Sequence, residues 1–189
     1  MHSEKQLLQR AKDFDLEALE EIFNRYNDGL YRYAYRLLGD ASMAEECVSE
    51  TFNRLLQAFH NDKGPDKYLR AYLYRIAHNW IAAYYKKHTQ PDLNLELVLD
   101  HLSEADDNTA SIAEINMQRE WIRKAIIDLP VPQQTAIVLK YFEGWSNKEI
   151  AAIMKKTVGA VKALENRGIS NLKKKIQIES VRRDRHGSR

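Results

Sequence analysis

The sequence predicts an all-α protein with two small helical domains joined by a flexible acidic linker, the second domain containing a helix-turn-helix. Three observations lead to this prediction. Apolar residues recur at intervals of three and four along both halves of the chain, which is the spacing of amphipathic helices. Glycine (7) and proline (4) are few among 189 residues, and this favours helices over a turn-rich β fold. The third observation is the distribution of charge.

Charge divides the chain into blocks. Residues 1–90 hold 13 Lys/Arg and 13 Asp/Glu, whereas residues 91–115 hold 7 Asp/Glu and no Lys/Arg. Residues 116–189 hold 16 Lys/Arg against 7 Asp/Glu. We therefore expect a first domain over 1–90, a linker over 91–115, a second domain over 116–175 and a basic tail over 176–189. The basic part indicates nucleic acid as a partner.

Three helices are expected before residue 61. Residues 4–12 form a short one, Asp15 caps a second that Gly39 ends, and Asp40 caps a third over 41–59. The positions at helical spacing that should face the core are Leu7, Leu8, Ala11, Leu19, Ile22, Phe23, Tyr26, Leu30, Ala34, Leu37, Ala44, Val48, Thr51, Phe52, Leu55 and Phe59. The opposite face of the third helix is polar and carries Glu46, Ser49, Glu50 and Asn53.

After a loop at 60–67, a fourth helix is expected over 67–87. Its inward positions are Leu69, Tyr72, Leu73, Ile76, Trp80 and Tyr84. A second face mixes cations, an amide and aromatic rings, with Arg75, Asn79, Ala82 and Lys86 beside Ala71, Tyr74, His78 and Tyr85. Melted DNA is bound by cations that follow the phosphates and by rings that stack on bases. The alternative is a Tyr-rich core helix with a basic end, which spacing by itself favours.

Pro91 ends the fourth helix. Residues 92–115 indicate a linker with room for one helical turn at 95–102, and helicity should resume at Ile115. A further helix is expected over 133–142, and the chain after Leu172 is expected to be frayed.

Residues 146–172 predict a helix-turn-helix. Ser146 and Glu149 have the spacing of a capping box, and Thr157 can cap a second helix after a turn that leaves no room for a loop. The inward stripe of the second helix is Val158, Val161, Leu164, Gly168 and Leu172, and its outward positions are Gly159, Lys162, Ala163, Asn166 and Ser170, with Arg167 on the flank. Lysine and arginine suit phosphate or guanine there, and asparagine suits an adenine edge. An ordinary helical hairpin with a solvated face is the alternative.

Three blocks of sequence resemble the extracytoplasmic-function (ECF) sigma factors of bacterial RNA polymerase. AEECVSETF (44–52) resembles that family's polymerase-binding helix, and AYLYRIAHNWIAAYYKK (71–87) resembles the helix that reads the minus-ten promoter element. LPVPQQTAIVLKYFEGWSNKEIAAIMKKTVGAVKALENRG (129–168) resembles the domain that reads the minus-thirty-five element. The order and spacing of the blocks also match.

The resemblance implies a sigma factor that binds core RNA polymerase and directs promoter recognition and transcription initiation. It implies three sets of binding residues: Glu46, Ser49, Glu50 and Asn53 for polymerase; Arg75, Asn79, Lys86 and Lys87 for the melted non-template strand of the minus-ten element; and Lys148, Thr157, Lys162, Ala163, Asn166 and Arg167 for duplex promoter DNA at the minus-thirty-five element. It also implies an anti-sigma protein that covers both DNA-reading domains.

Some residues depart from the family pattern. Glu46 stands where the family usually has Asp, Ser49 where it often has Gln, and Tyr72 where it usually has Trp. Leu164-Glu165 replaces a frequent Arg-Leu pair in the recognition helix. An acidic side chain there repels DNA unless it faces another protein residue or accepts a hydrogen bond from a cytosine amino group.

Two other classes of function compete with the sigma-factor interpretation. A one-component helix-turn-helix regulator would bind its operator without polymerase, but it does not need the polar face of residues 71–87. An enzyme is disfavoured because the six histidines are scattered and no metalloprotease, nucleophile-elbow or phosphate-loop motif occurs. We therefore expect no catalysis, no cofactor and no metal site.

The remaining features bound the setting of the protein. Cys47 is the single cysteine, which excludes an intrachain disulfide and indicates a small packed residue. No apolar run approaches the roughly 20 residues of a membrane span, and the N-terminus is polar. A cytoplasmic protein without membrane insertion is the expectation.

Overall fold

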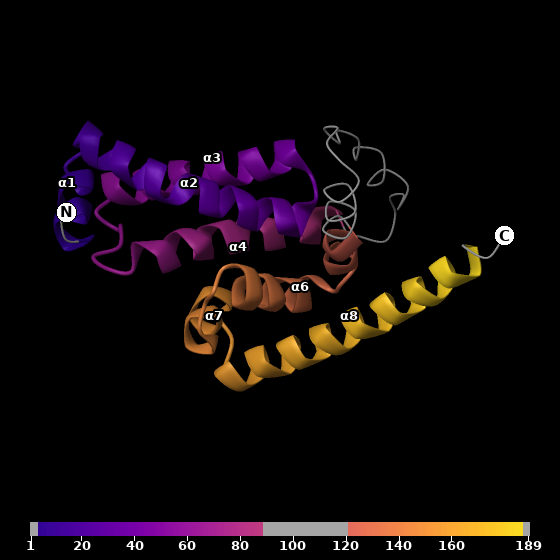
Figure 1. Ribbon diagram of the computed structural model, residues 1–189. Coiled ribbons are helices and arrows are strands. Elements are labelled where there is room, and N and C mark those ends of the chain that lie inside the picture. The colour runs from indigo at the N-terminus through magenta and orange to yellow at the C-terminus, as the bar shows by residue number, and fades with distance from the viewer. Residues whose placement is uncertain (1–3, 89–120, 187–189) are drawn as a thin grey trace.

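The computed structural model describes residues 4–88 and 121–186, with side chains up to residue 177. The regular structure in these two ranges is entirely helical, as predicted. Figure 1 shows two groups of helices: α1 to α4 lie together, α6 and α7 lie beside α4, and α8 packs on α6 and α7 on the side away from α4. The predicted linker, its helical turn at 95–102 and the return of helicity at Ile115 fall outside the described residues.

The first domain consists of α1 (Glu4–Lys12), α2 (Leu16–Leu38), α3 (Ala41–His60) and α4 (Leu69–His88). The predicted caps are confirmed. The Asp15 carboxylate accepts hydrogen bonds from two backbone N–H groups at the start of α2, and Asp40 accepts one at the start of α3. Gly39 ends α2 at φ 74°, a left-handed conformation that glycine adopts without steric cost.

The core of the first domain agrees with the predicted stripes on α1, α2 and α3, with one exception. Phe23 was expected to face inward but is 45% exposed, and its ring lies 4.9 Å from that of Phe52. Both rings sit at the edge of the α2–α3 contact, where helical spacing cannot separate a core position from a bordering one. Cys47 is fully buried, and this burial raises the pKa of its thiol to about 12. It is therefore an unreactive packed residue, as expected.

The predicted inward stripe of α4 is wrong by part of a turn. The buried side chains are Leu69, Leu73, Tyr74, Ala77 and Ile81. Trp80 and Tyr84 are only partly buried and stack on each other with ring centroids 5.8 Å apart. The apolar stripe of α4 is broad because this helix contacts two bodies, α2 and α3 on one side and the second domain on another.

The second domain contains a helical segment at 121–127, followed by α6 (Val131–Ile137), the π-helical turn η1 (Val138–Phe142), α7 (Asn147–Met154) and α8 (Val158–His186). The single helix predicted over 133–142 is thus α6 and η1, and it begins two residues earlier with proline in its first turn. The prediction of a frayed tail after Leu172 is wrong, since α8, which is 29 residues long, extends to His186. No helix within 4–88 or 121–186 is long and apolar enough to cross a bilayer.

Candidate nucleic-acid interface

The helix-turn-helix is built from local signals. At the start of α7 the Ser146 hydroxyl accepts a hydrogen bond from the Glu149 N–H at 3.4 Å, and the Glu149 carboxylate accepts one from the Ser146 N–H at 2.8 Å. These bonds complete the predicted capping box and lower the pKa of Glu149. Thr157 caps α8 by accepting from the Ala160 N–H at 3.2 Å. Both caps are therefore confirmed.

The turn between α7 and α8 contains a strained residue. Lys155 has φ 52° and ψ 47°, which is left-handed backbone that costs a side-chain-bearing residue about 1–2 kcal/mol. The conformation is held because the Lys155 and Lys156 N–H groups both donate to the Ala151 carbonyl. The turn thereby ends α7 within one residue and sets the direction of α8.

Replacing Lys155 with glycine is expected to stabilise the protein by about 0.5–1 kcal/mol, because the strain is larger than the extra entropy of unfolded glycine. Lys156→Gly is the matched control: Lys156 is also exposed, the substitution removes the same charge, and the native φ there is not positive. The control is expected to destabilise. Urea denaturation of both variants measures the difference, and equal effects at the two positions would contradict the assignment of strain to Lys155.

The outward face of α8 is polar and solvent-accessible. Lys162, Asn166 and Arg167 are exposed, and Ala163 is partly buried. Thr157 and Lys148 are exposed beside them, at the turn and on α7. All six residues predicted to contact duplex DNA thus lie on the helix-turn-helix, and five of them are exposed.

The inward face of α8 differs from the prediction at two places. Val158 was expected inward but is 36% exposed. Glu165 is 7% exposed and accepts a hydrogen bond from the Asn147 side chain at 3.3 Å. It therefore faces another protein residue, and of the two alternatives left open by the sequence the structure supports this one. A Cβ on the buried Gly168 would lie 2.6 Å from Ile137 Cδ1, which is why α8 can approach α6 closely.

The second face of α4 separates into two parts. Asn79, Lys86 and Lys87 are exposed, and Arg75 is partly buried with its guanidinium 5.3 Å from the Tyr72 ring centroid. These residues can meet a ligand together. The aromatic flank was grouped with them in the sequence but points elsewhere.

The aromatic flank of α4 packs against the second domain. Tyr74 is 2% exposed and its ring lies 5.1 Å from that of Trp145 in the second domain, whereas the Tyr85 hydroxyl donates to the Leu37 carbonyl of α2. Burial lowers the pKa of His78 to about 4, so its imidazole is neutral at neutral pH. His78 is partly buried, and its Nδ1 atom is fully covered.

Sequence reasoning missed a row of aromatic rings at the end of α4. The Tyr84 ring lies 5.8 Å from that of Trp80 and 4.2 Å from that of His88. Their i, i+4 spacing was visible in the sequence, but spacing alone does not distinguish a partly exposed row from a core stripe.

The polar face of α3 is also accessible. Glu46, Ser49 and Asn53 are exposed, and Glu50 is held by Arg54 with 2.7 Å between Nε and Oε1. That hydrogen bond lowers the pKa of Glu50, which keeps the carboxylate charged. Within the described ranges, no group of three or more His, Cys, Asp or Glu side chains is placed to hold a metal ion.

Two helical domains, one with an exposed helix-turn-helix and one with a cationic amide-bearing helix face, define a two-part nucleic-acid-binding protein. Family models match both parts: sigma-70 region 2 over residues 22–90 and sigma-70 region 4 over residues 119–172. The chain is 30% identical over 184 residues to the ECF RNA polymerase sigma factor SigW of Bacillus subtilis, covering 92% of this chain and 96% of SigW. This chain belongs to the ECF sigma factors.

Other relatives agree in fold and sequence. BldN of Streptomyces coelicolor, also an ECF RNA polymerase sigma factor, is 29% identical over 171 residues, which cover 88% of this chain but only 63% of BldN. The solved structure of CnrH with the cytosolic domain of CnrY has a TM-score of 0.68 at 21% identity, covering 92% of this chain and 97% of that one. The sigma factor RpoE with the anti-sigma factor NepR from Bartonella quintana has a TM-score of 0.64 at 20% identity, covering 88% and 98%.

Proposed function

We propose that this chain binds core RNA polymerase and directs it to promoters, one domain taking unpaired bases and the other reading duplex DNA. The observation that supports the proposal is the presence of two different exposed polar surfaces with cations and an amide, one in each domain. The Asn79 face of α4 suits single strands, and the Lys162 face of α8 suits a major groove. A third polar surface, on α3, would bind core polymerase. The units correspond to residues 1–90 and 116–175, with 91–115 as the connection.

The first domain would hold a flipped base of the non-template strand. The Asn79 amide offers both a donor and an acceptor to a base edge, and Arg75, Lys86 and Lys87 offer cations to the phosphates on either side. Extruding a base costs a few kcal/mol, which hydrogen bonds and stacking must offset. The Trp80–Tyr84–His88 row supplies rings next to this face for such stacking.

The second domain would place the N-terminal half of α8 in the major groove. Lys162 and Asn166 lie one turn apart on its exposed face, and Arg167 lies beside them. Lys148 and Thr157 flank this face and suit backbone phosphates. Burial of Glu165 supports this role, because the one carboxylate in the first three turns of α8 is directed away from the groove.

An anti-sigma protein is the expected inhibitor. The support is that the structurally similar RpoE was solved with an anti-sigma factor and CnrH with the cytosolic domain of CnrY. We assign no catalysis to the chain, since bond formation would belong to the polymerase, and we place the protein in the cytoplasm with that enzyme.

Run-off transcription tests the proposal. Purified core polymerase on a library of genomic promoters is expected to start transcripts at defined sites only when this protein is added. The alternative, a one-component regulator, would instead bind a DNA site without polymerase and start no transcript. Failure to associate with core polymerase in a pull-down would reject the sigma function.

Replacing Arg167 with alanine is expected to weaken promoter binding by the holoenzyme and to reduce the slope of log affinity against log salt by about one, because one phosphate contact is lost. Lys173→Ala is the matched control, because Lys173 is an exposed cation about four helical turns beyond the start of α8. Filter binding at several salt concentrations measures both slopes. An unchanged slope in Arg167→Ala would remove Arg167 from the phosphate contacts.

A further inference from the structure

One side of α4 carries a line of polar and aromatic residues that starts just before the helix. In order along the chain, they are Tyr68, Tyr72, Arg75 and Asn79. Their intervals of four, three and four residues are those of a single helical face. The Tyr68 carbonyl accepts a hydrogen bond from the Tyr72 N–H at 3.1 Å, so Tyr68 stands at the N-terminal end of this face. From Tyr68 to Asn79 the face extends roughly 16 Å at 1.5 Å per residue.

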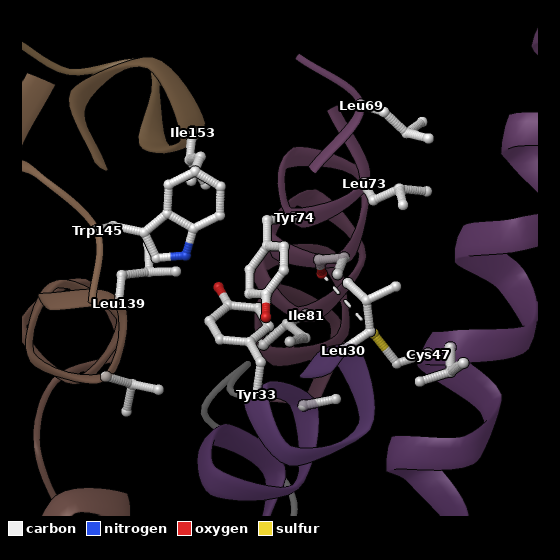
Figure 2. Close-up of a cluster of buried hydrophobic side chains, with 14 of the residues drawn as sticks. Leu30, Tyr33, Cys47, Leu69, Leu73, Tyr74, Ile81, Leu139, Trp145 and Ile153 are labelled. Carbon is white, nitrogen blue, oxygen red and sulfur yellow. Dashed lines mark hydrogen bonds between the residues drawn. The ribbon is translucent and has the colours of Figure 1, made fainter. Parts of the chain in front are cut away.

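The packing of α4 keeps this face out of the core of the first domain. Leu69 and Leu73 are fully buried, and Figure 2 shows both of them pointing toward the side of Cys47 on α3. These contacts fix the rotation of α4 about its axis. Asn79 is exposed in consequence, and Tyr68 is 68% exposed.

Tyr68 is held in an unfavourable conformation. Its φ of 59° is left-handed backbone, in which the Cβ of a residue other than glycine is crowded. Such strain persists only where the surrounding structure holds it, and it is concentrated at binding sites. Lys67 Nζ lies 5.5 Å from the centroid of the exposed Tyr68 ring, and Lys63 is also exposed on this loop. An exposed ring beside cations is the combination that binds single-stranded nucleic acid.

The start of α4 is capped by a residue of α1. A tyrosine before a helix lacks the short side-chain acceptor that usually binds the first N–H groups. The Glu4 carboxylate supplies it, because its Oε1 accepts a hydrogen bond from the Leu69 N–H at 2.7 Å across 65 positions of sequence. A negative charge at a helix N-terminus is also favourable to the helix dipole. Glu4 therefore fixes the point at which the chain passes from Tyr68 into α4.

α1 contacts the loop before α4 a second time. Lys12 Nζ lies 2.5 Å from Asp66 Oδ1, and this hydrogen bond lowers the pKa of Asp66. Asp66 is 88% exposed, and an exposed ion pair contributes little by itself, so Glu4 is the main contact. α1 is anchored independently of both contacts by the buried Leu7 and Leu8. Figure 1 shows α1 at the same end of the first domain as the loop between α3 and α4.

We propose that Tyr68 stacks on an unpaired base of the non-template strand, on the loop side of the base taken at Asn79, and that α1 positions Tyr68 through Glu4. The inference rests on the proposed function, because it adds a second base to the same strand. Glu4 is a positioning residue, since it contacts the Leu69 backbone rather than DNA. α1 ends before residue 22, where the match to sigma-70 region 2 begins.

Abasic sites in the holoenzyme's promoter test the stacking. Tyr68→Ala is combined with an abasic site at each non-template position of the melted region in turn, on a promoter from the run-off library. Loss of one stack between a ring and a base is expected to reduce heparin-resistant open complexes about 5- to 150-fold. At one position, Tyr68→Ala and the abasic site together should cost no more than either change alone.

Two variants control for the ring and for the strain. Tyr68→Phe keeps the ring and should stay within about twofold of wild type. Phe14→Ala is the matched control, because Phe14 is also an exposed ring on left-handed backbone, at φ 57° on the turn after α1. It should change open complexes less than about twofold at every abasic position. Losses in Tyr68→Ala that are additive with the abasic site at every position would overturn the stacking, as would an equal loss in Tyr68→Phe.

Glu4→Ala tests the positioning, because it removes the acceptor of the Leu69 N–H, whereas Glu4→Gln keeps an oxygen there. Glu4→Ala is expected to cause part of the Tyr68→Ala loss and to cost nothing further when Tyr68 is already alanine. Glu4→Gln should restore most of the open complexes. Glu20→Ala, which removes an exposed carboxylate of α2, is the control and should have no effect. A Glu4→Ala loss of the same size with and without the Tyr68 ring would show a merely structural role and reject the positioning.

The outcomes also separate this inference from the proposed function. If the wild-type protein starts no transcript with core polymerase, both are rejected. If the wild-type protein starts transcripts and Tyr68→Ala forms open complexes at the wild-type level, the stacking alone is rejected and the sigma function stands.

Discussion

Asn79→Ala is expected to reduce open-complex formation about 10- to 100-fold, while association with core polymerase stays at the wild-type level. The magnitude follows from the 1–3 kcal/mol that a well-placed amide contributes to discriminating a base. Asn79 is exposed on α4, so its amide is available to a base edge, and Arg75, Lys86 and Lys87 supply the neighbouring cations. Permanganate footprinting of unpaired thymines on a promoter from the run-off library measures the melting.

This substitution cannot act through unfolding. Alanine has a higher helix propensity than asparagine, so Asn79→Ala should leave α4 at least as stable as before. Asn24→Ala, an exposed amide on α2, is the matched control and should melt promoters normally. Normal melting in Asn79→Ala would show that another residue takes the unpaired base.

Glu46→Lys is the second substitution with a large expected effect, a loss of at least about tenfold in competition for core polymerase. Glu46 is exposed on the polar face of α3. A polymerase surface that binds its carboxylate is expected to be positively charged, so a lysine at this position would be repelled. Competition against a labelled sigma factor for a limiting amount of core polymerase measures the change.

The effect of Glu46→Lys should be confined to polymerase binding. Glu20→Lys carries the same change in charge on an exposed part of α2 and should compete normally. Because the position is exposed and within a helix, the free energy of unfolding should change by less than about 0.5 kcal/mol. Undiminished competition by Glu46→Lys would move the polymerase surface away from this face of α3.

Most of the helices and their ends could be predicted because their signals are local. Asp15, Asp40, Ser146 and Thr157 each cap a helix through backbone groups two or three residues away, so a short window of sequence contains both partners. The exposed residues of the helix-turn-helix were predictable for the same reason, since the period of a helix separates Lys162 and Asn166 from Val161.

Errors arose where a helix contacts more than one neighbour. Tyr74 was grouped with the DNA-facing part of α4, yet it is buried against Trp145 and Glu143 of the second domain. Glu165 sits at a position where a charge is unexpected, and only its contact with Asn147 explains its burial. Helical spacing predicts the face of the helix on which a residue lies, but not which neighbouring helix or domain packs against that face.

Sequence alone determined the all-helical class, the caps, the helix-turn-helix and the resemblance to sigma factors, because each depends on residues close together in the chain. Tertiary structure alone decided how the two domains meet. Arg36 and Glu143 are 107 residues apart, and no periodicity or spacing relates them. Their ion pair forms only because α2, α4 and the loop before α7 converge. The burial of the Glu143 carboxylate and its pairing with Arg36 therefore depend on the tertiary fold.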